Sequence, residues 1–183
     1  DAEMPADFFS VLGSSKAEQI NLRPVFNIDG ACLIAPEGTM SEVRIMACMA
    51  IEAAKKSKNQ SFILRLHPVL KKDKVLRLLQ DLTPLPDNFS ISDQSLEDDL
   101  NRSSWLCYRG STMAFQGMLR GLRPIYLDVD HCADDNDPVP NSAGFRKIAT
   151  TSDGLNAIIA ADRTSGEDAQ KDITRAVNFA KDY

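Results

Sequence analysis

Residues 93–128 read DQSLEDDLNRSSWLCYRGSTMAFQGMLRGLRPIYLD, and helical and strand patterns alternate along them. The acid-rich start at 95–98 predicts the beginning of a helix, and the apolar run at 105–108 predicts a buried strand. After a polar turn at 109–112, apolar residues recur at helical spacing until Gly121, and a second apolar run follows. This order of helix, strand, turn, helix and strand predicts part of a parallel sheet covered by helices.

The polar turn Arg109-Gly110-Ser111-Thr112 is a candidate anion-binding site. Ser111 or Thr112 can cap the helix that follows, and Gly110 permits the backbone conformation that the turn requires. A helix N-terminus after such a turn offers free backbone N–H groups, hydroxyls and the positive end of the helix dipole. The alternative is an ordinary capped loop, because Ser and Thr caps are common in every fold.

The rest of the chain continues the alternation of strands and helices. We expect strands near 31–35, 61–66, 88–92, 104–108 and 124–128, and a last short strand at 145–149. Helices are expected after a cap at Thr39 or Ser41, and at about 71–81, 152–161 and 167–183. The prediction is a three-layer, Rossmann-like α/β domain with a mainly parallel sheet at 30–183, after a lead-in segment or former interdomain linker at 1–29.

The common strand order 3-2-1-4-5, if it applies, places the first strand beside the fourth. The switch point of the sheet then lies between the turns at 36–39 and 109–112, and a ligand should bind in that crevice. Glu37 and Gly38 belong to the first turn, where Glu37 either bonds to a nearby amide or accepts a hydrogen bond from a ligand hydroxyl. His67, after the second strand, opens onto the same edge. Three polar turns are therefore expected to converge.

Charge and composition argue against several classes of protein. The net charge of −5 disfavours nonspecific nucleic-acid binding, and no apolar run approaches the roughly 20 residues of a membrane span. The chain lacks the glycine-rich signatures of P-loop ATPases and dinucleotide-binding dehydrogenases, and the G-x-S-x-G elbow of serine hydrolases. We therefore expect a protein with no transmembrane segment, no cofactor and no nucleic-acid partner.

Four short motifs stand in order along residues 30–130. They are Arg65-Leu66-His67-Pro68, then Ile91-Ser92 followed by Leu96-Glu97-Asp98-Asp99-Leu100, then Gly110-Ser111-Thr112 at a strand end, and Gly121-Leu122-Arg123-Pro124-Ile125. Together they resemble the C-terminal half of GT-B glycosyltransferases. The similarity is greatest to enzymes of surface-polysaccharide and teichoic-acid assembly, whose donor domain carries an R-x-H-P element and a later G-S-S turn. The resemblance implies a domain that binds the nucleoside diphosphate of an activated sugar or polyol.

The resemblance also implies roles for particular side chains. Arg65 and His67 would lie near the phosphates, and Ser111 and Thr112 would hold them. Gln116 stands where the family often has an acidic residue that binds the ribose. From the residues alone, the alternatives are an ordinary strand end at His67 and a surface ion pair at Arg65.

The N-terminal domain that brings the glycan acceptor in this family has no counterpart in these 183 residues. The resemblance therefore implies the donor-binding part of a glycosyltransferase without transfer activity on its own, and it assigns no catalytic residue. The expected location is cytoplasmic, or peripheral to the inner membrane face through a longer parent protein. A noncatalytic nucleotide- or carbohydrate-binding module of the same fold is the alternative.

The cysteines and the acidic loop do not predict a metal centre. The four cysteines show no C-x-x-C spacing, which favours buried, reduced thiols in a cytosolic protein: Cys32, Cys48, Cys107 and Cys132. The sequence at 128–130 resembles the D-x-D metal motif of a different glycosyltransferase architecture. Because the surrounding loop is rich in acids, we expect it to stay solvated, with a weak divalent-ion site of hard oxygens as the alternative.

Overall fold

A computed structural model describes residues 26–129, 137–139 and 143–182. Most of the predicted lead-in segment lies outside these ranges, as do Asp130, Cys132 and much of the acid-rich loop. Phe26, the first described residue, packs edge-on against Trp105 with ring centroids 5.4 Å apart. Its backbone N–H donates to Oε1 of Gln170 at 2.7 Å, so this end of the segment is part of the packed domain.

The described chain forms one sheet in the order β3-β2-β1-β4-β5-β6, and every neighbouring pair is parallel. The strands are β1 (Ala31–Ile34), β2 (Phe62–Leu64), β3 (Phe89–Ile91), β4 (Ser103–Tyr108), β5 (Arg123–Leu127) and β6 (Lys147–Ala149). The expected order 3-2-1-4-5 is confirmed, and β6 extends the sheet beyond β5. Leu33 of β1 pairs with Leu106 of β4, so the topological switch point lies between these two strands.

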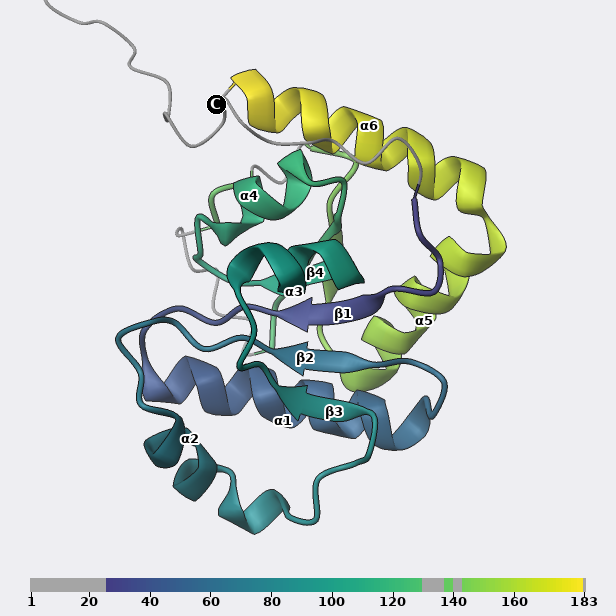
Figure 1. The fold of residues 1–183 in the computed structure, drawn as a ribbon. Coiled ribbons are helices and arrows are strands. Elements are labelled where there is room, and N and C mark those ends of the chain that lie inside the picture. Colours follow the sequence, from purple (N-terminus) through teal and green to yellow (C-terminus); the bar gives the residue numbers. More distant parts are fainter. Residues whose placement is uncertain (1–25, 130–136, 140–142, 183) are drawn as a thin grey trace, which may run out of the picture.

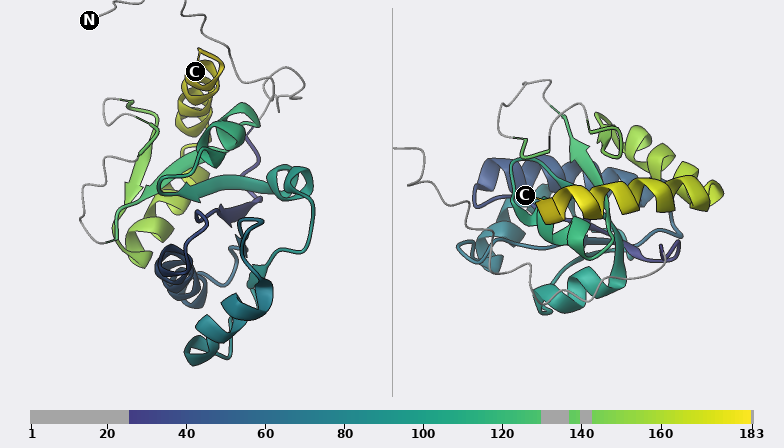
Figure 2. Two further views of the ribbon diagram at one scale, coloured as in Figure 1. Left: turned by 90° about the vertical axis from the view of Figure 1, so that its left-hand side faces the viewer. Right: turned by 90° about the horizontal axis from the view of Figure 1, so that it is seen from above.

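Helices cover both faces of the sheet (Figures 1 and 2), which confirms the predicted three-layer α/β class. They are α1 (Met40–Lys56), α2 (Lys72–Leu78), α3 (Leu96–Arg102), α4 (Met113–Leu119), α5 (Ser152–Thr164) and α6 (Gly166–Asp182). α1 and α5 pack on one face, α3 and α4 on the other, and α6 contacts both β5 and α4. None of the described helices is long and apolar enough to cross a membrane.

The helix expected at 71–81 is shorter in the structure. α2 ends at Leu78, and a separate 3₁₀ turn, Gln80–Leu82, follows it. Chains often tighten into such a turn at the end of an α-helix. The buried Leu79 lies between the two elements, where it packs into the core beneath α1.

The central strands are buried along their whole length, because a parallel sheet carries helices on both faces. Successive side chains point to opposite faces, so Cys32 packs on the α1 side and Leu33 on the α3 side. The expected burial is confirmed for Cys32 and Cys107, whose sulfurs lie 3.4 Å apart on neighbouring strands. It is wrong for Cys48, which is only partly buried on α1.

Gly117 and Gly121 fix how α4 sits between β4 and β5. A Cβ atom on Gly117 would lie 2.4 Å from Cδ2 of Leu106, so only glycine permits this close approach of the helix to the strand. Gly121 has a φ of 78°, and the N–H groups of Gly121 and Leu122 donate to the carbonyls of Met118 and Gly117. This pattern is a Schellman motif, and it confirms that Gly121 ends the helix.

A buried ion network anchors the opposite edge of the sheet, where the strands begin. Arg123, at the start of β5, is 1% exposed; its Nη2 lies 2.6 Å from Asp172 of α6 and its Nε 3.3 Å from Asp162 of α5. Asp162 also accepts a bond from the indole N–H of Trp105 at 3.0 Å. These contacts join β4 and β5 to the two C-terminal helices, and sequence reasoning did not find them.

Candidate functional site

The predicted site residues follow the carboxyl ends of β1, β2 and β4, which lie at one edge of the sheet (Figure 1). Two close approaches show that their turns meet there. A Cβ atom on Gly110 would lie 2.4 Å from Oε1 of Glu37, and one on Gly38 would lie 3.6 Å from Nδ1 of His67. The turn after β1 is therefore in contact with the turns after both of its neighbours, as the sequence predicts.

Glu37 is held by the first turn of α1. Its backbone N–H donates to Oε2 of Glu42 at 3.0 Å, and Thr39 caps the helix by accepting from the Glu42 N–H at 3.4 Å. The cap is therefore Thr39 rather than Ser41. Because the backbone of Glu37 is fixed, its half-buried carboxylate stays against Gly110, where an acceptor of hydrogen bonds can serve a ligand.

Ser111 rather than Thr112 caps α4. The Ser111 hydroxyl accepts from the N–H of Met113 at 3.2 Å, and its carbonyl accepts from the N–H of Ala114 at 3.1 Å. Thr112 makes no side-chain capping bond and is exposed. A hydroxyl that accepts one bond can still donate its own proton, so capping does not prevent Ser111 from binding a ligand.

His67 is exposed beside Gly38 at the rim of the same edge. Its Nδ1 accepts from the N–H of Val69 at 3.4 Å, and its carbonyl accepts from the N–H of Leu70 at 2.9 Å. With Nδ1 used as an acceptor, Nε2 is the nitrogen that can donate outward. The neighbouring Val69 is 69% exposed, which makes this part of the rim partly apolar.

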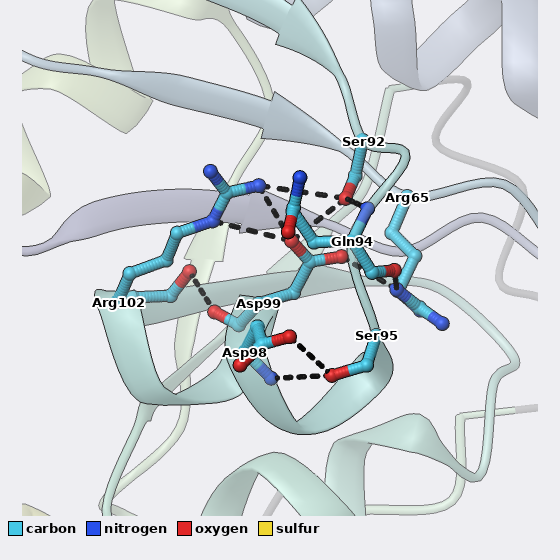
Figure 3. Close-up of polar contacts among 8 residues, drawn as sticks. Arg65, Ser92, Gln94, Ser95, Asp98, Asp99 and Arg102 are labelled. Atoms are coloured by element: carbon cyan, nitrogen blue, oxygen red, sulfur yellow. Dashed lines mark hydrogen bonds and ion pairs between the residues drawn. The ribbon is translucent and has the colours of Figure 1, made fainter.

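Arg65 lies in a polar network with Asp99 and Arg102 of α3 (Figure 3). Its Nη1 lies 2.6 Å from Oδ2 of Asp99 and 3.0 Å from the carbonyl of Gln94. Asp99 is fully buried. The ion pair that the sequence offered as an alternative for Arg65 is therefore present, although its partner is internal.

Gln116 lies one turn into α4, on the helix that Ser111 caps. Its backbone carbonyl accepts from the N–H of Arg120 at 3.2 Å. Within residues 26–129, no hydrogen bond or ion pair joins its side chain to Glu37, Arg65 or His67. The structure therefore brings together the turns after β1, β2 and β4, while Gln116 stands apart from their contacts.

The burial of Asp99 near this edge was not predicted from the sequence. Asp99 belongs to an acid-rich run that resembles a solvated first helical turn, yet it lies on the same helical face as Leu96 and Leu100. That spacing was the available signal of burial. Tyr108, the last residue of β4, is also buried, and burial raises the pKa of its phenol well above the usual range. Among the described residues, no cluster of side chains could hold a metal ion.

No protein-family model matches the chain, and no relative is found among curated proteins. Solved structures share its fold. TarM matches with a TM-score of 0.61 at 14% identity, over 88% of this chain and 33% of that one. UDP-GlcNAc 2-epimerase from Neisseria meningitidis, bound to UDP-GlcNAc, matches with a TM-score of 0.57 at 15% identity, over 86% of this chain and 44% of that one.

The C-terminal CMP-Kdo binding domain of WaaA from Acinetobacter baumannii matches with a TM-score of 0.51 at 10% identity, over 81% of this chain and 88% of that one. The chain thus spans about a third to a half of TarM and the epimerase, but nearly all of this separate domain. The matches include glycosyltransferases of the GT-B class. The chain has the fold of the C-terminal domain of GT-B glycosyltransferases, which confirms the resemblance at the level of the fold.

Proposed function

We propose that this chain is the donor-binding domain of a glycosyltransferase, and that it binds a nucleotide-activated sugar or polyol. The observation that carries the proposal is the meeting of three polar turns over the switch point between β1 and β4, with Glu37 against Gly110 and Gly38 against His67. In open parallel sheets, ligands bind outside the carboxyl ends of the strands at this place.

The side chains of the three turns suit different groups of the ligand. Ser111 and Thr112 offer hydroxyl donors beside Gly110, and they would bond to phosphate oxygens. The Glu37 carboxylate carries the same sign of charge as a phosphate, so it suits a sugar or ribose hydroxyl instead. His67 and Arg65 would contribute donors from the β2 side. Donors fixed in advance stabilise the charge that develops on a departing nucleoside diphosphate.

The comparisons support a nucleotide ligand without naming it. The epimerase is described with UDP-GlcNAc and the WaaA domain as binding CMP-Kdo, so one fold takes different nucleotides. Because the chain spans only part of TarM and the epimerase, we place the acceptor-binding half and the transfer step outside these 183 residues. We also propose that the chain serves polysaccharide assembly in the cytoplasm, or at the inner membrane face through a longer parent protein.

A noncatalytic carbohydrate- or nucleotide-binding module of the same fold is the second candidate. The ion pair between Arg65 and Asp99 favours this candidate, because it gives Arg65 a structural role that requires no catalysis. Fold likeness does not separate the two candidates, since the same fold serves an epimerase.

Thermal unfolding and calorimetric titration with UDP, CDP and CMP test the proposal. A nucleotide that binds only the folded chain should raise its stability by about 2.7 kcal/mol at a hundred times its dissociation constant. We expect binding of at least one of these nucleotides, and no transfer of labelled sugar by the chain alone. The absence of binding to all three would contradict a donor site, and transfer by the isolated chain would contradict the division into two halves.

A further inference from the structure

Asp99 holds two arginines with its two carboxylate oxygens at the α3 side of the site (Figure 3). Oδ1 accepts from Nη2 of Arg102 at 2.6 Å, from Nε of Arg102 at 3.2 Å, and from the Ser92 hydroxyl at 2.7 Å. Oδ2 lies 2.6 Å from Nη1 of Arg65. The Asp99 carboxylate is therefore fixed at both oxygens.

The second arginine is not required to neutralise Asp99. Arg102 already pairs with Oδ1 through two nitrogens, and one buried carboxylate needs one cation for charge balance. Arg65 adds a further positive charge, and the three groups together carry a net charge of +1. A surplus cation next to the proposed ligand site favours an anion.

The Arg65 side chain is restrained through one nitrogen only. Nη1 donates to both Asp99 and the carbonyl of Gln94, which fixes the plane of the guanidinium. Within the described part of the chain, no residue bonds to Nε or Nη2 of Arg65. Figure 3 shows the other terminal nitrogen pointing away from the network, so donors remain for a ligand.

The position of Arg65 in the chain places it on the α3 side of the sheet, next to the β1 turn. Arg65 lies two residues after Ile63, so its side chain leaves β2 on the α3 side, where Ile63, Leu100 and Met113 pack in one cluster. Met113 begins α4, directly after the Ser111–Thr112 turn. Because β2 and β4 are the two neighbours of β1, Arg65 and that turn flank the β1 turn from either side.

We propose that Asp99 is a positioning residue, which holds Arg65 so that its remaining donors face a phosphate group bound over β1. This inference rests on the proposed function, because the phosphate is that of the nucleotide donor. Asp99 itself does not touch the ligand; it acts by fixing the direction of Arg65 before binding. A donor fixed in advance loses less conformational entropy when the ligand arrives.

A double-mutant cycle in nucleotide affinity tests the proposal. We would titrate the full chain and the variants Arg65→Gln, Asp99→Asn and the double variant with UDP, CDP and CMP, below the melting temperature of each. Arg65→Gln should weaken binding by about tenfold to a hundredfold, because it removes a charged donor. Asp99→Asn should weaken it by about threefold to tenfold, because the guanidinium remains but is no longer held. In the Arg65→Gln background, Asp99→Asn should change affinity less than about twofold.

The matched control is Arg102→Gln, which removes the other cation of the same carboxylate. It should lower the melting temperature while leaving nucleotide affinity within about twofold, because Arg102 pairs with the oxygen that Arg65 does not use. If Asp99→Asn weakens binding equally with and without Arg65, or if Arg102→Gln weakens it as much, Asp99 supports the fold alone and the proposal is overturned.

Arg65→Lys keeps the proposal testable if the Asp99 variants do not fold. Lysine retains the charge but carries all its donors on one nitrogen, so it cannot bond to Asp99 through one nitrogen and to a ligand through another, as the planar guanidinium can. We expect it to lose most of the affinity that Arg65→Gln loses, whereas full affinity in Arg65→Lys would overturn the proposal. Absence of nucleotide binding to the unmodified chain would overturn the proposed function together with this inference. Binding that does not depend on Arg65 would overturn the inference alone.

Discussion

The two edges of the sheet use charged side chains in opposite ways. At the amino edge, Arg123 and Asp162 are buried; they pair with each other, and they bond to Asp172 of α6 and Trp105 of β4. At the carboxyl edge, His67 and Thr112 are exposed, and Glu37 is half-buried. The buried pair of Arg123 and Asp162 serves the fold, whereas polar groups that are exposed at the switch point remain accessible to a ligand. The comparison predicts that substitutions at the two edges affect different properties.

The largest expected effect is on stability at the amino edge. Arg123→Met should lower the free energy of unfolding by about 3–5 kcal/mol, because it leaves the buried Asp162 without its cation. Nucleotide affinity, measured below the melting temperature, should not change. Urea unfolding and calorimetric titration of the same variant check both statements.

The control for Arg123→Met is Lys56→Met, which removes an exposed cation from its 2.8 Å pair with Asp153. Solvent screens this pair, so the loss of stability should be below about 1 kcal/mol. Equal losses in the two variants would remove the distinction between buried and exposed charges on which the comparison depends.

An intermediate effect is expected at Gly117, which lies between the two edges. Gly117→Ala places a methyl group 2.4 Å from Cδ2 of Leu106. Overpacking costs about 1–3 kcal/mol, and alanine recovers up to about 1 kcal/mol through helix propensity, so a modest net loss of stability is expected. Because α4 carries the Ser111–Thr112 turn, nucleotide affinity should fall as well, unlike in Arg123→Met.

Gly166→Ala is the matched control for Gly117→Ala, because a Cβ atom on Gly166 meets no atom within 4 Å. Thermal melts should show this variant to be as stable as the unmodified chain or slightly more stable. A Gly117→Ala variant with unchanged stability and unchanged affinity would show that the close approach of α4 to β4 does not fix the turn.

The smallest effect is expected at Tyr108, directly below the carboxyl edge. Burial raises the pKa of its phenol, and no described residue bonds to its hydroxyl. Unfolding restores the ordinary pKa near 10, so above that pH the unfolded chain releases a proton that the folded chain keeps. The stability that Tyr108 contributes is therefore complete below about pH 10 and is lost as the pH rises.

Tyr108→Phe should therefore make the alkaline loss of stability less steep. At neutral pH the change should be below about 1 kcal/mol, because the variant removes a hydroxyl to which no described residue bonds. Urea unfolding at several pH values up to about 11 measures both quantities. If stability falls equally with pH in the variant and in the unmodified chain, folding does not raise the pKa of the phenol.

The strand order and the meeting of the polar turns could be predicted because they depend on local patterns and on the general rules of parallel sheets. The turns at 36–39 and 109–112 carry recognisable turn residues, and the rules of parallel sheets bring them together. Gly121 ends the helix as predicted. The helix end requires a left-handed backbone conformation, and a glycine at that point in the sequence indicates it.

The ion pairs of Arg123 and Arg65 could not be predicted, because the partners are distant in sequence. Arg123 pairs with Asp172 and Asp162, which lie 49 and 39 positions further along the chain, and nothing near Arg123 indicates this. The same is true of Arg65, because its partner Asp99 is 34 positions away, in the acid-rich start of a helix. Side-chain pairing between elements depends on the final packing, which local periodicity does not encode.

Ser111 provides the most direct test of a ligand site at the carboxyl edge. Ser111→Ala removes a cap hydroxyl, and so does Thr151→Ala at the start of α5, where Thr151 accepts from the N–H of Gly154 at 3.0 Å. Both variants should lose about 1 kcal/mol of stability. Calorimetric titration with UDP, CDP and CMP should show nucleotide affinity reduced about tenfold to a hundredfold in Ser111→Ala alone. Unchanged affinity in Ser111→Ala, beside an equal loss of stability in both variants, would contradict the phosphate site and leave Ser111 as a cap.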